Sequence, residues 1–218
     1  MTENLSSAPA LEVQLSQVFE ELGVNPQDKA TIESLLEPLK QKDQNTFQHV
    51  GRVGLSARNI GRFLHLDEKA LFFAGLLHDL GKSQIPQDIL GKTEGWTDAD
   101  SKVVQAHVIN GHEALKGRFD FTAEIIVLHH TFQENGYPKD LPEQLHRYSP
   151  ETQALILEYA RVLALADVYD ALHRENDKFG EKRKLSGAEI KVKMLEFNPD
   201  RQEQIEDLYR AGIFQQSE

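Results

Sequence analysis

Residues 70–82 read ALFFAGLLHDLGK, an apolar run that ends in an adjacent histidine and aspartate. Residues 70–77 are apolar on every side of a helix, which in a protein surrounded by water predicts that the helix is buried all round. His78 and Asp79 then stand at the end of a central helix, in the interior of the fold. Burying such groups without partners is costly, so the segment predicts a site that compensates both side chains.

The rest of the chain predicts an all-α helical bundle. Apolar residues recur at helical spacing in residues 49–64. Two more single helices are predicted, one that begins at Thr97 and Asp100 and has its inward stripe over residues 103–114, and one over residues 151–173. Residues 81–96 contain several glycines and a proline, which is typical of a loop. No segment shows the strict alternation of apolar and polar residues that indicates a strand.

The two ends of the chain are also predicted to be helical. Residues 1–44 contain two short amphipathic helices, the second beginning at Asn25-Pro26. Near the other end, Ser186 and Glu189 form a predicted capping box. We therefore divide the chain into an N-terminal helical extension, residues 1–44, and a main domain with C-terminal helices, residues 45–218.

Composition and charge restrict the classes of function. The chain has no cysteine, so any metal site must consist of nitrogen and oxygen ligands. The formal net charge of -11 argues against binding a nucleic-acid polymer, which requires clustered lysine and arginine. The sequence has no apolar run long enough to span a bilayer and no signal peptide. We expect a cytoplasmic protein without membrane contact.

Five histidines and two aspartates lie on inward stripes or at the ends of apolar helices, and together they predict a metal site. Imidazole and carboxylate ligands suit zinc, iron, manganese, cobalt or nickel, and we expect two divalent ions, with iron or manganese preferred. One carboxylate can bridge two metal ions, which is the role expected of Asp79. This seven-residue set comprises His49, His78, Asp79, His107, His129, His130 and Asp167. We predict surface or loop positions, and no role, for His65, His112, His146 and His173.

The order of these residues resembles the HD superfamily of metal-dependent phosphohydrolases, over roughly residues 45–175. HDLGK at residues 78–82 is similar to its signature. The HD-GYP branch, whose members hydrolyse cyclic di-GMP, is the nearest likeness, because GYP at residues 136–138 follows the paired histidines. DVYDA at residues 167–171 also fits that branch.

The resemblance implies an HD-domain bundle and a role for each matching residue. One metal ion would be held by His49, His78, Asp79 and Asp167, and the second by Asp79, His107, His129 and His130. Lys82 would face the phosphate and act with Asp79 in catalysis, although a lysine at a helix end can also simply complement the helix dipole. Tyr137 would contact the substrate, and so would a basic residue for which Arg174 is the choice and Lys178, Lys182 and Arg183 are the alternatives.

The chain departs from the HD-GYP pattern in three places. Thr131 stands where the branch usually has a glutamate, and the loop that follows is shortened to FQEN, residues 132–135. Asn45 occupies the position of an acidic residue that binds a third metal in some relatives, so two ions are expected. The Arg-Pro-Tyr segment after the last aspartate is missing, and a basic stretch that begins at Arg174 replaces it.

The predicted function is hydrolysis of a cyclic dinucleotide, foremost cyclic di-GMP, by a hydroxide that bridges two metal ions. Three alternatives stay open: a hydrolase of a nucleotide or another phosphate ester, an HD-fold di-iron oxygenase, and a nucleotide-binding module without turnover. A panel of substrates, oxygen uptake, and binding without product formation would identify them in turn. Residues 1–44 could pack on the main domain or mediate a homodimer.

Overall fold

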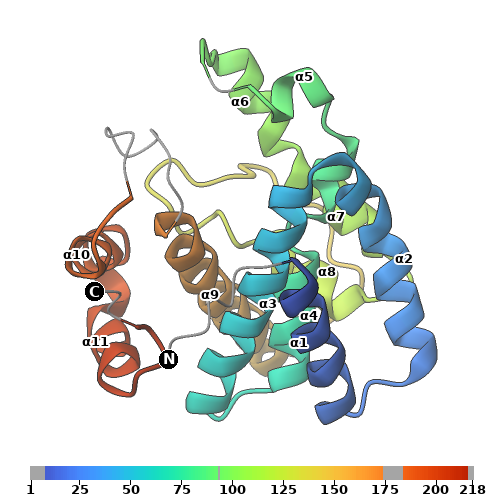
Figure 1. Cartoon of the computed structure of the whole chain (residues 1–218). Coiled ribbons are helices and arrows are strands. Elements are labelled where there is room, and N and C mark those ends of the chain that lie inside the picture. Colours follow the sequence, from blue (N-terminus) through green and yellow to red (C-terminus); the bar gives the residue numbers. More distant parts are fainter. Residues whose placement is uncertain (1–7, 93, 174–183, 216–218) are drawn as a thin grey trace.

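The computed structural model describes residues 8–92, 94–173 and 184–215, and these residues form helices joined by loops, with no strand among them (Figure 1). This confirms the predicted all-α class. The α-helices in chain order are α1 (Ala8–Glu21), α2 (Pro26–Lys42), α3 (Gln44–Phe63), α4 (Glu68–Leu77), α5 (Gln87–Leu90), α6 (Asp98–Gln105), α7 (His107–Leu115), α8 (Asp120–Ile126), α9 (Pro150–Leu172), α10 (Gly187–Phe197) and α11 (Gln202–Arg210). Two 3-10 helices are η1 (Leu80–Gln84) and η2 (Pro199–Arg201).

Side-chain caps define where several helices begin. Asn25 caps α2 with Pro26 behind it, as predicted, and its side chain accepts from the backbone amide of Asp28. Ser186 and Glu189 form the predicted capping box of α10. Asp43 caps α3 by accepting from the amides of Asn45 and Thr46. These caps satisfy amide groups that a helix leaves without internal partners.

Helices α3 and α4 lie against each other at two glycines. A Cβ atom on Gly75 would lie 2.5 Å from the Cα of Gly54, so only glycine allows this approach. The close crossing brings the first turns of α3 near the end of α4. It thereby places His49 beside His78, with ring centroids 5.2 Å apart.

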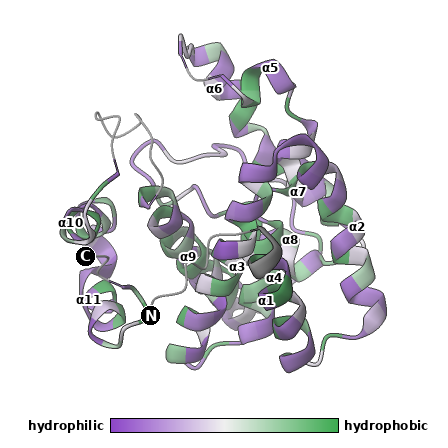
Figure 2. Cartoon of the chain, viewed as in Figure 1, coloured by the Kyte–Doolittle hydropathy of each residue, from purple (hydrophilic) through white to green (hydrophobic). Residues whose placement is uncertain are grey.

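One hydrophobic core joins the N-terminal helices to the rest of the bundle. Leu15, Phe19 and Leu36 are buried in the same cluster as the apolar residues of α3, α4 and α9. In Figure 2 the central α9 is largely green, whereas the outer α2 mixes purple with green. Helices α1 and α2 thus pack on the main domain, and the division at residue 44 stays a prediction.

Helices α10 and α11 lie beside α9 (Figure 1). Two ion pairs attach η2, which connects α10 to α11, to α9: Arg161 of α9 donates to Asp200 at 2.7 Å, and Arg201 donates to Glu158 of α9 at 2.5 Å. No helix in the described part of the chain is both long and apolar enough to cross a membrane.

Three local predictions were wrong. Residues 81–96, predicted as a loop, contain most of η1 and all of α5. The helix predicted to begin at Thr97 does so, but the single helix expected from there through residue 114 is two helices, because the chain breaks at Ala106. His112, predicted to lie on the surface or in a loop, is fully buried in α7. It shares the inward side of α7 with Val108 and Leu115, four residues before it and three after it.

Candidate metal centre

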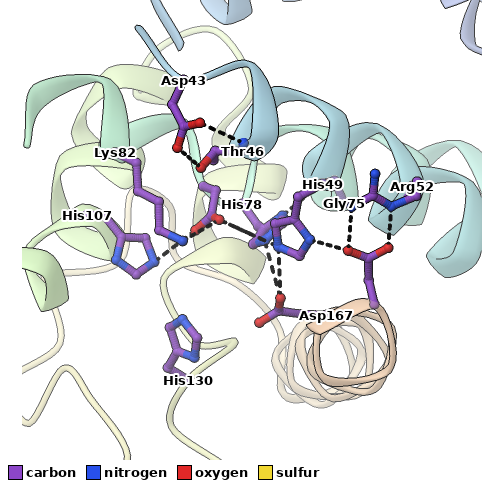
Figure 3. Close-up of polar contacts among 12 residues, drawn as sticks. Asp43, Thr46, His49, Arg52, Gly75, His78, Lys82, His107, His130 and Asp167 are labelled. Carbon is purple, nitrogen blue, oxygen red and sulfur yellow. Dashed lines mark hydrogen bonds and ion pairs between the residues drawn. The ribbon is translucent and has the colours of Figure 1, made fainter. Parts of the chain in front are cut away.

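The seven-residue set comes from five separate segments that converge on one space. Figure 3 labels five of its members, which are His49, His78, His107, His130 and Asp167. His49 lies on α3, His78 and Asp79 follow the last residue of α4, and Asp167 lies on α9. His107 begins α7, and the histidines at 129 and 130 follow α8. Three groups have candidate ligand atoms within 4.8 Å of one another; they are His49–His78–Asp79, His107–His129–His130 and His78–His129–Asp167.

The centre is buried. His49 exposes 2% of its surface, His78 none and Asp79 1%. Neutral imidazoles and carboxylates in such a place need partners, because an unpaired buried polar group destabilises the fold. The hydrogen bonds that these side chains make, and the atoms that make none, indicate which ligand the site can bind.

Asp79 faces both sides of the centre. Its Oδ2 atom lies 3.7 Å from Nε2 of His49 and 3.5 Å from Nε2 of His78. Its Oδ1 atom lies 3.2 Å from Nε2 of His107. The two oxygens of one carboxylate therefore point to two different groups of histidines, the arrangement that a bridging ligand needs. Asp167 adds a second carboxylate, with Oδ1 3.1 Å from Nε2 of His49.

Hydrogen bonds orient three of the histidine rings in the same way. Nδ1 of each ring lies within 2.8 Å of the backbone carbonyl oxygen three residues earlier; the pairs are His78 with Gly75, His107 with Val104 and His129 with Ile126. A carbonyl oxygen can only accept, so Nδ1 carries the proton and Nε2 presents a lone pair. This is the way that metal-binding histidines are usually held.

Several atoms at the centre are buried and form no hydrogen bond with any residue that the structure describes. They are Nε2 of His78, His107 and His129, and Oδ1 of Asp79. Each carries a lone pair directed at the shared space, and nitrogen and oxygen donors of this kind suit a divalent transition metal. The donor set therefore fits the metal ions that the sequence predicts.

His49 is held differently. Its Nδ1 atom lies 2.7 Å from Oδ2 of Asp170. Arg52 donates from Nε to Oδ1 of Asp170 at 2.6 Å and from Nη2 to Oδ2 at 3.0 Å. Sequence analysis missed both residues. The available signal was spacing: Arg52 lies one helical turn after His49, and Asp170 one turn after Asp167, so each shares a helix face with a predicted ligand.

Burial and neighbouring charges shift the pKa values at the centre. Burial lowers the pKa of His78, that of His107 to about 3 and that of His129 to about 4. Burial also opposes the charge on Asp79, but the Lys82 ammonium holds its pKa well below the usual range. Neutral imidazoles around an ionised carboxylate are the protonation states in which these groups bind metal.

A close backbone contact holds His107 in place. A Cβ atom on Gly81 would lie 2.0 Å from the carbonyl oxygen of His107 and 2.7 Å from the backbone nitrogen of Gly111. Glycine at position 81 thus lets η1 pack directly against α7. The contact positions His107 relative to Asp79, which directly precedes η1.

Two of the predicted substrate-binding residues, Lys82 and Tyr137, can be placed relative to the centre. Nζ of Lys82 donates to Oδ2 of Asp79 at 2.6 Å, and its side chain is partly exposed. The ring of Tyr137 lies 4.5 Å from that of His130, centroid to centroid. Arg174 lies outside the described residues. The structure therefore brings Lys82 and Tyr137 to the centre.

Comparisons with known proteins agree with the family resemblance. The HD domain family profile matches residues 46–172, more than half of the chain. The cyclic di-GMP phosphodiesterase response regulator RpfG of Xanthomonas campestris is 31% identical over 157 residues, 68% of this chain and 39% of that protein. The 3'3'-cGAMP-specific phosphodiesterase 1 of Vibrio cholerae is 30% identical over 179 residues, 79% of this chain and 37% of that protein. The chain thus spans less than two thirds of the length of either relative.

Solved structures show the same fold. The HD domain of the L. monocytogenes phosphodiesterase PgpH, in complex with cyclic-di-AMP, superposes with a TM-score of 0.57 at 19% identity. The match covers 77% of this chain and 82% of that one. Together these matches confirm the predicted HD-superfamily, HD-GYP-like resemblance. The chain belongs to the HD domain family.

Proposed function

We propose that the chain is a metal-dependent phosphodiesterase that hydrolyses a cyclic dinucleotide, with cyclic di-GMP as the first substrate to test. The observation that carries the proposal is the convergence of unpartnered imidazole Nε2 atoms on the two oxygens of Asp79. The names of the relatives support the substrate class, because they act on cyclic di-GMP and on 3'3'-cGAMP.

The seven-residue set divides into two subsites that share Asp79. The first subsite is His49, His78, Asp79 and Asp167, and the second is Asp79, His107, His129 and His130. Distances favour this division, since Oδ2 of Asp79 faces the histidines of the first subsite and Oδ1 faces His107 of the second. Iron or manganese is the proposed metal.

The chain's own residues prepare the site for an anionic substrate. Two divalent ions bound there would activate a water molecule as the nucleophile and neutralise the phosphoryl oxygens. The low pKa of Asp79 keeps that carboxylate ionised at neutral pH. Lys82, partly exposed beside Asp79, places a cation at the edge of the centre where a phosphate would arrive. The Tyr137 ring covers His130 and limits access of solvent.

Metal content and turnover, measured together, test this proposal. We expect about two ions per chain by elemental analysis and hydrolysis of cyclic di-GMP. Asp79→Ala should lose both ions and all turnover, because the two subsites share that carboxylate. Lys82→Ala should keep its metal and lose substrate affinity. Metal retained in full by Asp79→Ala would refute the bridging role, and a metal-loaded chain without turnover would refute the phosphodiesterase.

One observation favours a second candidate, a hydrolase of another nucleotide or phosphate ester. Thr131, which replaces the usual glutamate of the HD-GYP branch, donates its hydroxyl to the carbonyl oxygen of Leu128 at 2.7 Å. It therefore offers no carboxylate to a substrate. A panel containing cyclic di-GMP, 3'3'-cGAMP, linear dinucleotides and nucleoside monophosphates separates the two candidates by relative kcat/KM.

A further inference from the structure

The ligand histidines differ in the groups that support them. His78, His107 and His129 each donate from Nδ1 to an uncharged backbone carbonyl. Nδ1 of His130 lies 3.0 Å from the side-chain amide of Gln133, which is also uncharged. His49 differs from these four histidines in that the partner of its Nδ1 atom is a carboxylate, Oδ2 of Asp170 at 2.7 Å.

Arg52 fixes this carboxylate. It donates to Oδ1 of Asp170 through Nε and to Oδ2 through Nη2, at 2.6 and 3.0 Å, so both oxygens are engaged (Figure 3). A planar guanidinium that binds a carboxylate through two nitrogens sets its orientation as well as its position. Asp170 therefore cannot turn away from His49 without breaking the contacts with Arg52.

We infer that Asp170 and Arg52 are positioning residues that make the first subsite bind its metal ion more tightly than the second, so that the two subsites fill in sequence. The inference rests on the proposed dinuclear centre. An imidazole that donates to a carboxylate is a stronger electron donor at its other nitrogen than one that donates to a carbonyl. Asp170 supplies that carboxylate only to the first subsite.

The distribution of charge points the same way. The first subsite contains Asp167 in addition to the shared Asp79, whereas the negative charge of Asp170 behind His49 is paired with Arg52. The second subsite has three imidazoles and the shared Asp79. Nζ of Lys82 lies 2.6 Å from Oδ2 of the shared Asp79, so the carboxylate that distinguishes the two subsites is Asp167. More negative charge around the first subsite favours a divalent cation there.

Metal titration of the full chain tests the inference without measuring activity. The metal-free chain is dialysed against increasing free Mn²⁺, and bound ions are counted by elemental analysis. The wild-type chain should bind two ions in two steps. Asp170→Asn keeps the shape and removes the charge, and it should weaken the tighter step by about 10- to 100-fold. Arg52→Gln should weaken the same step by a smaller factor, because Asp170 remains but is no longer held.

The matched control is Gln133→Ala, which removes the side chain beside His130 and should leave the tighter step unchanged. Circular dichroism checks that each variant folds. If Asp170→Asn does not fold, Arg52→Gln is measured in its place, because the Arg52 side chain is partly exposed. If Asp170→Asn shifts both steps equally or neither, the inference is overturned while the dinuclear centre stands. If the wild-type chain binds fewer than two ions, the proposed centre fails first.

Discussion

At the scale of residues, burial lowers the pKa of four of the five histidines of the centre, and the Lys82 ammonium beside Asp79 keeps that carboxylate ionised. In the metal-free chain the lowered histidine pKa values make the free energy of unfolding depend on pH. The pKa values of His107 and His129 are about 3 and about 4 in the folded chain, against about 6.5 when unfolded. The pKa values of His78 and His130 are lowered as well.

We expect the free energy of unfolding of the chelator-treated chain to fall as pH decreases from 7 to about 5. Below about pH 6.5 these histidines bind protons in the unfolded chain but not in the folded chain. Each such group lowers the free energy of unfolding by up to about 1.4 kcal/mol per pH unit. His49 has a raised pKa and contributes in the opposite direction, since its stabilisation is lost as pH rises. Four histidines have a lowered pKa and one has a raised pKa, so the net effect of acidification is to destabilise the folded chain.

Urea denaturation at pH 7 and pH 5.5 measures this dependence. His107→Gln, which cannot take up a proton, should reduce the slope. A stability that does not change over this range would show that these histidines are not buried in their neutral form.

At the scale of elements, close contacts between helices decide where the ligands stand. Periodicity predicted the helices that carry His49 and Asp167. It did not predict the break at Ala106, because the apolar stripe continues across it. His107 lies at the start of α7, where its carbonyl oxygen contacts the backbone of Gly81, and that tertiary contact cannot be read from spacing along one helix.

We expect Gly75→Ala to destabilise the chain by about 1–3 kcal/mol and to lower its metal content. The new Cβ would lie 2.5 Å from the Cα of Gly54, and backbone atoms cannot give way without separating α3 from α4. That separation would move His49 away from His78. Urea denaturation and elemental analysis provide the two measurements.

Gly51→Ala is the matched control for this substitution. It is also a glycine within a helix, but its Cβ would meet the side-chain tips of Leu11 and Leu15, which can move. Its effect should be small and its metal content normal. Equal losses in both variants would contradict the role assigned to the α3–α4 crossing.

At the scale of the whole molecule, one core supports a centre whose ligands come from residue 49 to residue 167 of the chain. A ligand that binds only the folded state stabilises it, by about 2.7 kcal/mol when its free concentration is 100 times Kd. Because the centre joins α3, α4, α7, α8 and α9, bound metal should stabilise the entire bundle. A cytoplasmic location and a homodimer formed through residues 1–44 stay predictions.

We expect Tm to fall when metal is removed by a chelator and to recover when Mn²⁺ is added back. Thermal melting followed by circular dichroism measures both changes. Asp79→Ala should melt at the same temperature with and without metal, because its shared ligand is gone. A wild-type Tm that does not respond to metal would show that the centre does not bind it in the folded state.

The sequence by itself determined the helical class, because helical periodicity is a local feature. Its short motifs, among them His78-Asp79 and His129-His130, are also local, and they carried the family resemblance and the prediction of the seven-residue set. Tertiary structure alone decided which oxygen of Asp79 faces which histidine, that Asp170 and Arg52 hold His49, and that His112 is buried. His49 and Asp170 are 121 positions apart, and their contact exists only because α3 packs against α9. Spacing along one helix shows which of its residues share a face. Which residues of another helix that face contacts depends on how the two helices pack.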